Sequence, residues 1–397
     1  MCNDQNLLAR IDLNFLISYL SFSQEQSKKG AKKKENMANE DNLVRFGILG
    51  CAEIARKICR AINLSPNSTI QAISSRSAEK AKQFALKNSL SELVNVYGNY
   101  EQVLDDPSVD AVYIPLPTSL HLKWAVLAAQ KKKHVLLEKP TALNVVDLDR
   151  ILEACESNGV QFMDGSMWYH HPRTSRMKEL LSDPNFFGQV KTIYSSSSYL
   201  PPPIFFENDI RTKSDLDGLG ALGDAGWYCI GAILWAMNNK LPTTITTLPA
   251  TKRNSNGVIM SATVSLHWEQ EETTAIFYCS FLSHETMDVM VLGSKGSFHV
   301  EDLIIPYEET SATFKCSSGA SFADLHIGWN KAEEEVRVQN ELPQEALMVE
   351  EFSRLVKEIK YYKNKPDTKW AGISRTSQVV LDAVKASLDS GFKTVFI

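Results

Sequence analysis

Several features are scarce in this chain of 397 residues, and each absence excludes a class of protein. Its seven cysteines are odd in number and scattered, without the CxxC or Cys/His spacing of a metal site. We therefore expect reduced thiols, a cytoplasmic protein and no bound metal. No apolar run approaches the roughly 18 residues of a membrane helix. The net charge of −5, without a long basic stripe in the globular part, argues against nucleic acid and favours a small-molecule ligand.

The composition that remains is ordinary for a globular enzyme, with 44% hydrophobic and 22% charged residues. The length predicts two domains. We expect a disordered leader over residues 1–42, with Met37 as an alternative start of translation. A nucleotide-binding domain over 43–165 and a second domain over 166–397 are expected to follow.

Short apolar runs alternate with helical patterns in the first of these domains. The expected strands are Val44–Leu49, Ile70–Ser74, Ala111–Ile114, Val135–Leu137 and Val160–Met163, and the expected helices are Ile54–Leu64, Ala78–Leu86, Leu120–Gln130 and Val146–Ser157. This alternation predicts an α/β fold with a doubly wound parallel sheet of the Rossmann type.

The pattern changes after about residue 165, where longer runs have period-two character. The expected strands there are Val258–Trp268, Thr273–Phe281 and Met287–Leu292, followed by the helices Gln344–Tyr361 and Ser374–Leu388. The second domain is therefore expected to be α+β, with a mixed or antiparallel open sheet. We expect its last helices to pack back near the first domain, and a ligand to bind in the cleft between the domains.

The turn after the first strand has the pattern G-x-A-x-x-A, a relaxed dinucleotide fingerprint. Small residues are needed there because a pyrophosphate must approach the backbone at the N-terminus of a helix. The turn's candidate cofactor contacts are Gly50, Cys51, Ala52, Glu53 and Ile54. A tight turn that binds nothing is the alternative.

Ser75 and Arg76 end the second strand, where enzymes that use NAD usually carry an acidic residue. A hydroxyl beside a guanidinium suits the 2′-phosphate of NADP instead, and Lys80 adds charge one turn later. The pair therefore predicts NADP as the cofactor. A solvated basic cluster at a helix start is the alternative.

Two loops follow strands whose carboxyl ends face the ligand crevice. The first contains Pro115, Leu116 and Pro117 and leads to His121, which is a candidate cofactor contact or a structural helix-start histidine. The second is Glu138-Lys139-Pro140, which places Lys139 where nicotinamide is expected. Proline after Lys139 restricts the lysine backbone and permits a cis peptide.

A glycine-rich segment then leads into a helix that carries Asp224 and Tyr228 four residues apart, and thus on one helical face. A phenol with a reference pKa of about 10 needs a nearby cation to exchange protons at neutral pH. Lys139 is a candidate for that cation. We expect Lys139 and Tyr228 to be acid–base groups in hydride transfer, with Asp224 orienting the substrate or the base. A helix-start charge beside a packed aromatic is the alternative.

Taken together, these motifs resemble the Gfo/Idh/MocA family from about Val44 to the C-terminus. The resemblance implies a catalytic role for Lys139 and places Trp168 in the cleft, as a candidate wall for nicotinamide or substrate. A buried aromatic at the domain interface is the alternative for Trp168. Tyrosine at position 228, where many members carry histidine, resembles the subgroup of dimeric dihydrodiol dehydrogenase and NADP-dependent D-xylose dehydrogenase, and plant members of the family. Two departures are Ala52 in the fingerprint and Tyr169, where an arginine is common.

The resemblance implies an oxidoreductase that uses NADP(H) to interconvert a carbohydrate-like alcohol and carbonyl, such as a sugar, polyol or dihydrodiol. It also implies a homodimer formed through the exposed face of the second sheet. Two alternatives are a sensor that binds NADP(H) without chemistry, and a lyase or glycosidase-type member that oxidises its substrate transiently. Pocket shape decides among substrates that share vicinal hydroxyls, so the sequence leaves the substrate itself open.

Overall fold

The computed structural model describes residues 42–325 and 327–397. The leader expected over residues 1–42 lies outside the described residues, except for Asn42. The rest of the chain from Val44 forms one compact unit. None of the helices in the described part of the chain combines the length and apolarity that crossing a bilayer requires.

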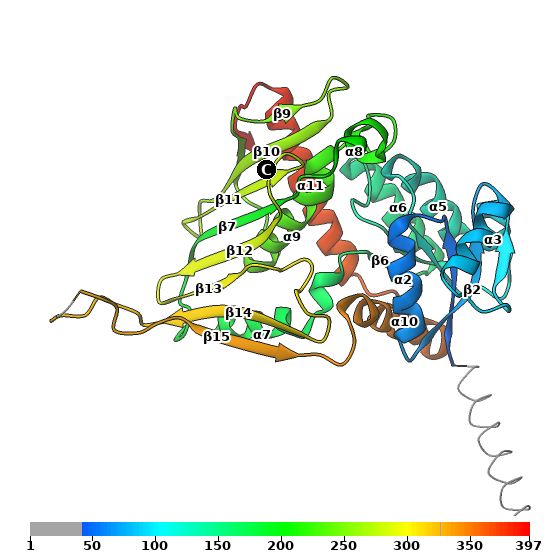
Figure 1. Cartoon of the computed structure of the whole chain (residues 1–397), viewed down its shortest axis with the longest axis horizontal. Coiled ribbons are helices and arrows are strands. Elements are labelled where there is room, and N and C mark those ends of the chain that lie inside the picture. Colours follow the sequence, from blue (N-terminus) through cyan, green and yellow to red (C-terminus); the bar gives the residue numbers. More distant parts are fainter. Residues whose placement is uncertain (1–41, 326) are drawn as a thin grey trace, which may run out of the picture. The chain divides into compact units, whose positions relative to one another are not determined.

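The first sheet has six parallel strands in the order β3-β2-β1-β4-β5-β6. Figure 1 shows helices around it. The strands are β1 (Val44–Leu49), β2 (Ser68–Ser74), β3 (Asn95–Tyr97), β4 (Ala111–Ile114), β5 (His134–Leu137) and β6 (Phe162–Asp164). The residues of β4, β5 and β6 are all buried, because helices cover both faces of the sheet. Such burial explains why their sequences are continuous apolar runs rather than alternating ones.

Two hydrophobic cores lie on opposite faces of this sheet. One joins β1 and β2 to α2 (Glu53–Leu64) and α10 (Gln344–Tyr362), where the rings of Phe46 and Phe352 are 5.8 Å apart. The other joins β4 and β5 to α4 (Tyr100–Asp105), α5 (His121–Gln130) and α6 (Val145–Asn158). The predicted doubly wound sheet is confirmed, and a helix from the end of the chain covers part of it.

The second sheet has ten strands, in the order β15-β14-β13-β12-β7-β11-β10-β8-β16 with β9 beside β10. They are β7 (Val190–Ser198), β8 (Thr244–Thr247), β9 (Lys252–Arg253), β10 (Ile259–Trp268), β11 (Thr273–Ser280), β12 (Thr286–Gly293), β13 (Gly296–Val300), β14 (Ser311–Ser318), β15 (Glu334–Gln339) and β16 (Val395–Phe396). Only β7 and β11 pair in parallel, so the predicted mixed sheet is confirmed.

Helices cover one face of this second sheet. α7 (Pro172–Ser182), α9 (Trp227–Ala236) and α11 (Lys369–Asp389) contribute buried side chains to its core, and α11 also contacts α6 and β6 of the first sheet. Along β7, Ile193 is buried against this core while the neighbouring Tyr194 is 45% exposed on the other face. The alternation expected of a half-covered sheet is therefore present.

Several elements lay beyond the sequence predictions, among them α7, α8 (Pro203–Asn208) and the strands β7, β8, β9 and β13 to β16 of the second sheet. Three further ones show why. β3 and α4 contain three and six residues, which is too short for hydrophobic periodicity to show. Leu222–Gly226 forms a single π-helical turn where a loop entering a helix is expected. Such turns are rare and are frequently found at functional sites.

Candidate active site

The turn between β1 and α2 has the backbone that a bound pyrophosphate requires. Gly50 has a φ of +123°, and a Cβ at this position would lie 3.0 Å from Leu116 Cδ2. Ala52 precedes α2 without a side-chain cap, so the first N–H groups of the helix stay open to an anion. Glu53 is the first residue of α2, and its exposed carboxylate lies 3.0 Å from the guanidinium of Arg56. Cys51 and Ile54 flank the turn and are half-buried.

The carboxyl end of β2 adjoins this turn, because the N–H of Gly50 donates to Ser74 O at 3.0 Å. Ser75 is buried, whereas Arg76 is exposed and forms no hydrogen bond or ion pair with the described residues. Lys80 lies in the first turn of α3 (Ala78–Lys87), close enough to Cys51 to oppose the rise that burial causes in the pKa of this thiol. The edge of the turn therefore carries two cations that can meet a phosphate.

The loop after β4 is fixed by His121. Nε2 of this ring lies 2.8 Å from Leu116 O and Nδ1 lies 3.2 Å from Thr141 O, with only 1% of the residue exposed. Because both ring nitrogens face backbone carbonyls, the side chain is not open to a cofactor. His121 thus differs from the cofactor contact expected from the sequence. It positions Leu116, which lies against Gly50, while Pro115 is buried and Pro117 half-buried beside it.

Glu138 also acts within the protein rather than on a ligand. Its carboxylate accepts hydrogen bonds from the hydroxyl of Tyr113 and, at 3.1 Å, from the N–H of Lys139. Burial raises the pKa of Glu138 above its usual value. The Lys139–Pro140 peptide bond is cis. These contacts fix the backbone of Lys139 where β5 ends.

Lys139 and Asp224 form a largely buried ion pair between the two sheets, with 11% and 14% of their side chains exposed. Lys139 Nζ lies 2.6 Å from Asp224 Oδ1 and 3.2 Å from the Asp224 carbonyl oxygen. Burial by itself lowers the pKa of Lys139. Asp224 and Tyr228 raise this pKa by more than burial lowers it, so the net shift is upward. Burial raises the pKa of Asp224, but the nearby cations lower this pKa by more, so the net shift is downward. Both groups are therefore charged at neutral pH.

Tyr228 lies one helical turn after Asp224, with its ring centroid 4.5 Å from Lys139 Nζ. Its hydroxyl contacts only the sulfur of Met167, at 3.8 Å, among the described residues. Burial raises the pKa of Tyr228 to about 12, and Lys139 opposes this shift. The phenol is thus free to meet a substrate oxygen beside a fixed ammonium group.

Two residues that the sequence reasoning missed complete this cluster. Tyr199 donates its hydroxyl to Asp224 Oδ2 at 2.9 Å, and Arg211 Nε lies 3.2 Å from Asp224 Oδ1. Neither belongs to a recognisable motif. The only available signal was general: a buried carboxylate needs more than one donor. With both oxygens occupied, Asp224 orients Lys139 more directly than it could orient a substrate.

Residues 199–218, which we call the strap, connect this cluster to the cofactor side. Asp217 Oδ1 accepts from the N–H of Thr118 at 3.0 Å and from its hydroxyl. Leu216 O accepts from the N–H of Ser119 at 3.0 Å. The strap therefore bonds both to the loop after β4 and to Asp224.

Trp168 does not line a cleft, and of the two alternatives for this residue its burial favours the buried aromatic over the wall of a ligand site. It is 1% exposed, stacks on Tyr169 at 3.9 Å and meets Trp235 edge-on at 6.1 Å. The short helical turn Met167–His170 directs its indole into the core of the second domain. Met167 contacts Tyr228 instead.

Comparison with known proteins matches residues 44–166 to the family described as "Oxidoreductase family, NAD-binding Rossmann fold" and residues 174–299 to the "GFO/IDH/MocA C-terminal domain". The chain belongs to the Gfo/Idh/MocA family. The subgroup named from the sequence is supported as well, because relatives include a D-xylose dehydrogenase and a dihydrodiol dehydrogenase.

The D-xylose 1-dehydrogenase (NADP(+)) 2 of Haloferax volcanii is 38% identical over 47% of this chain and 55% of its own length. The trans-1,2-dihydrobenzene-1,2-diol dehydrogenase of Danio rerio is 27% identical over 65% of this chain and 74% of its own. A 3-ketoreductase from Actinomadura kijaniata, solved with NADP and TDP-benzene, superposes with a TM-score of 0.74 at 24% identity, covering 87% of this chain and 98% of that one. The chain spans 52% to 57% of the length of the first curated relatives it matches.

Proposed function

We propose that this protein is an NADP-dependent oxidoreductase that transfers a hydride between nicotinamide C4 and a sugar, polyol or dihydrodiol-type alcohol or carbonyl. The observation that carries the proposal is the buried cluster of Lys139, Asp224 and Tyr228 at the end of β5. The relatives named above, which act on xylose and on a dihydrodiol, support this substrate class.

The residues present fit the cofactor. Gly50 leaves room for a pyrophosphate, the start of α2 offers free N–H groups, and Arg76 is unpaired at the edge. Bound NADP supplies the group that accepts or donates the hydride. We propose Ser75 and Lys80 as contacts on the phosphate side of the cofactor, and Lys139 as a contact on its nicotinamide side.

The side chains of this protein hold and move the proton. Tyr228 has a free hydroxyl within reach of the charged Lys139, so it can give a proton to, or take one from, the substrate oxygen while the ammonium stabilises the phenolate. Asp224 fixes the direction of Lys139, and Tyr199 and Arg211 fix Asp224. Because these groups are buried, water has little access to the charges that develop.

The activity is tested by a panel of aldoses, polyols, dicarbonyls and dihydrodiols with NADP and NADPH, followed at the absorbance of reduced nicotinamide. Turnover with at least one vicinal diol or hydroxyaldehyde is expected. Tight NADP binding without turnover of any member would favour the non-catalytic sensor instead.

The preference for NADP is tested with Arg76→Ala. The exposed guanidinium, which has no ion-pair partner among the described residues, is proposed to meet the 2′-phosphate, so the variant should bind NADP at least about tenfold more weakly while its Kd for NAD changes little. Calorimetric titration with both cofactors measures this. Equal weakening for both would mean that Arg76 serves the fold or the surface and does not read the phosphate.

We also propose a cytoplasmic homodimer without a nucleic-acid partner. The six cysteines in the described part of the chain are free thiols, which suits a reducing compartment. The face of the second sheet opposite the helices carries Tyr194, Ile276 and Met290 side by side on β7, β11 and β12. Such a row of large apolar side chains suits an interface with a second copy.

A further inference from the structure

The loop after β4 lies where the strand order of the first sheet reverses. From β1 the chain moves outward through β2 and β3, and then crosses to β4 on the other side of β1. In doubly wound sheets a dinucleotide binds in the crevice at this point. The loop also lies against the turn after β1, because a Cβ on Gly50 would be 3.0 Å from Leu116 Cδ2 and 3.7 Å from Pro115 O. The position of this loop therefore shapes the proposed cofactor site.

The strap holds this loop through Asp217. The loop forms the short helical turn Thr118–Leu120, and Pro117 before it has no side-chain group that could cap the turn. Asp217 Oδ1 takes that place, since it accepts hydrogen bonds from the N–H of Thr118 at 3.0 Å and from the Thr118 hydroxyl. Because Thr118 is only 2% exposed, both donors would lie buried without this partner if the carboxylate were removed.

Asp217 is itself fixed to the second sheet. The N–H of Gly218 donates to Lys213 O at 3.0 Å, which closes a tight turn around Asp217. Gly218 and Gly220 have φ values of +64° and +57°. A Cβ on Gly220 would lie 2.1 Å from Ile259 O at the start of β10, so the backbone passes directly against this strand. The carboxylate is thus attached to the second sheet and reaches a loop of the first.

The segment 217–224 leads directly to the pair of Lys139 and Asp224. It ends at Asp224, whose Oδ1 lies 2.6 Å from Lys139 Nζ. One short stretch of chain therefore carries the carboxylate that holds the loop beside the cofactor site and the carboxylate that orients Lys139. Transfer of a hydride and a proton to one substrate needs nicotinamide and Tyr228 at a fixed separation.

We propose that Asp217 is a positioning residue, which sets the loop after β4 against bound NADP and keeps that loop in register with Lys139 and Tyr228. This rests on the proposed NADP-dependent function and adds a residue through which the second sheet contributes to cofactor binding. The strands β2 and β4 lie on opposite sides of β1, so the loop after β4 faces the part of the cofactor that NAD and NADP share. Loss of Asp217 therefore weakens both cofactors, unlike loss of Arg76.

The test is calorimetric titration of NADP and of NAD into the wild type and two variants. Asp217→Ala leaves two buried donors without this partner, so both Kd values should rise by a similar factor of about ten. Asp217→Asn keeps an acceptor oxygen and should stay within about threefold of the wild type, a rescue that a general loss of stability would not show.

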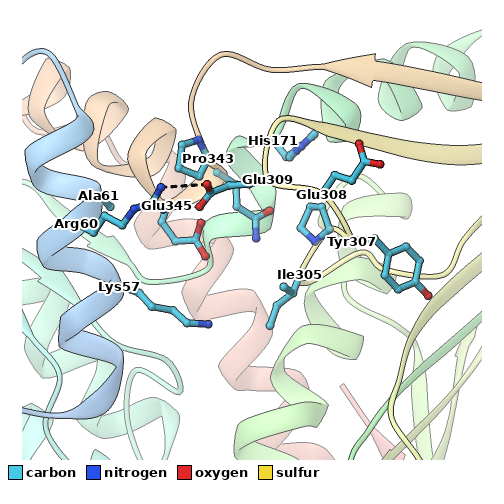
Figure 2. A pocket seen from close by; sticks show the side chains of 12 residues that line it. Lys57, Arg60, Ala61, His171, Ile305, Tyr307, Glu308, Glu309, Pro343 and Glu345 are labelled. Carbon is cyan, nitrogen blue, oxygen red and sulfur yellow. Dashed lines mark hydrogen bonds and ion pairs between the residues drawn. The ribbon is translucent and has the colours of Figure 1, made fainter.

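Arg60→Met is the matched control. Arg60 on α2 pairs with Glu309 on the loop after β13 at 3.0 Å, beside the cavity drawn in Figure 2. This exposed pair also joins the parts of the chain that build the two sheets, but it does not involve the loop after β4. Both Kd values should stay unchanged in this variant.

Thr118→Val removes only the hydroxyl and should weaken both cofactors about threefold. Combined with Asp217→Ala it should add little, because the two residues act through one contact. If Asp217→Ala does not fold, Thr118→Val and Asp217→Asn carry the same test.

An unchanged affinity in the alanine variant with a lower melting temperature, a loss confined to NADP, or losses that multiply in the double variant would overturn the role of Asp217. Weaker binding of both cofactors supports it even if no substrate is turned over, in which case the oxidoreductase proposal fails alone. A wild type that binds neither cofactor would overturn both.

Discussion

At the scale of single residues, the proposed chemistry places the exchanged proton on Tyr228, beside the charged Lys139. Lys139→Met keeps the length of the side chain but removes its charge, so kcat should fall at least about a hundredfold, as expected for lost acid–base catalysis. Tyr228→Phe should cause a similar fall. The double variant should lose far less than the product of the two, because the residues act as a unit. Steady-state kinetics of the four proteins measure this.

The control for this cycle is NADP affinity, which should change little because the phosphate contacts lie at the turn after β1. Circular dichroism should match the wild type. Near-normal turnover by Lys139→Met would remove the proposed site, and strictly multiplicative losses would mean that the two side chains act in separate steps.

How far the sequence predicts such residues depends on whether they belong to motifs. Lys139, Asp224 and Tyr228 were found because motif spacing and strand ends place them, and the structure brings them together. Tyr199 and Arg211 reach the same carboxylate from a segment without a motif. Trp168 and His121 lie near the site in sequence, but only packing shows that one ring is buried and the other is held by carbonyls. Tertiary contacts of this kind leave no local signal.

At the scale of elements, the same contrast holds. Hydrophobic periodicity predicts α2, α5, α10 and the central strands, because each buries a continuous stripe or run. Hydrophobic periodicity does not predict the strap, because its structure depends on partners elsewhere in the chain, notably Asp224 and the loop after β4.

A prediction for the strap concerns how kcat/KM depends on pH. Arg211 and Lys139 together hold the pKa of Asp224 below its usual value against the effect of burial. Arg211→Met should raise that pKa, so the ionised form that holds Lys139 is lost at a higher pH as the solution is acidified. We expect the acid limb of the kcat/KM profile to move to higher pH, with kcat/KM at neutral pH about tenfold lower.

Arg211→Lys should restore part of both effects, because it returns the charge without the geometry of the guanidinium. Arg375→Met, which breaks an exposed ion pair with Asp149, is the matched control and should leave the profile unchanged. A lower kcat/KM with an unmoved acid limb would mean that Arg211 merely supports the fold of the strap.

At the scale of the whole molecule, the second sheet has one face covered by α7, α9 and α11, whereas Tyr194, Ile276 and Met290 lie on the other. A stable protein interface buries about 800 Å² on each partner, so a broad sheet face of this kind is a suitable size.

We expect a homodimer in light scattering coupled to size exclusion. Tyr194→Glu combined with Met290→Glu places two like charges side by side at the centre of that face and should shift the mass to a monomer. Leu86→Arg, at an exposed position on α3, should leave the dimer intact. A wild-type monomer at micromolar concentration, or a double variant that stays dimeric, would place the interface elsewhere or remove it, because two charged side chains cannot be buried at a two-fold axis without partners.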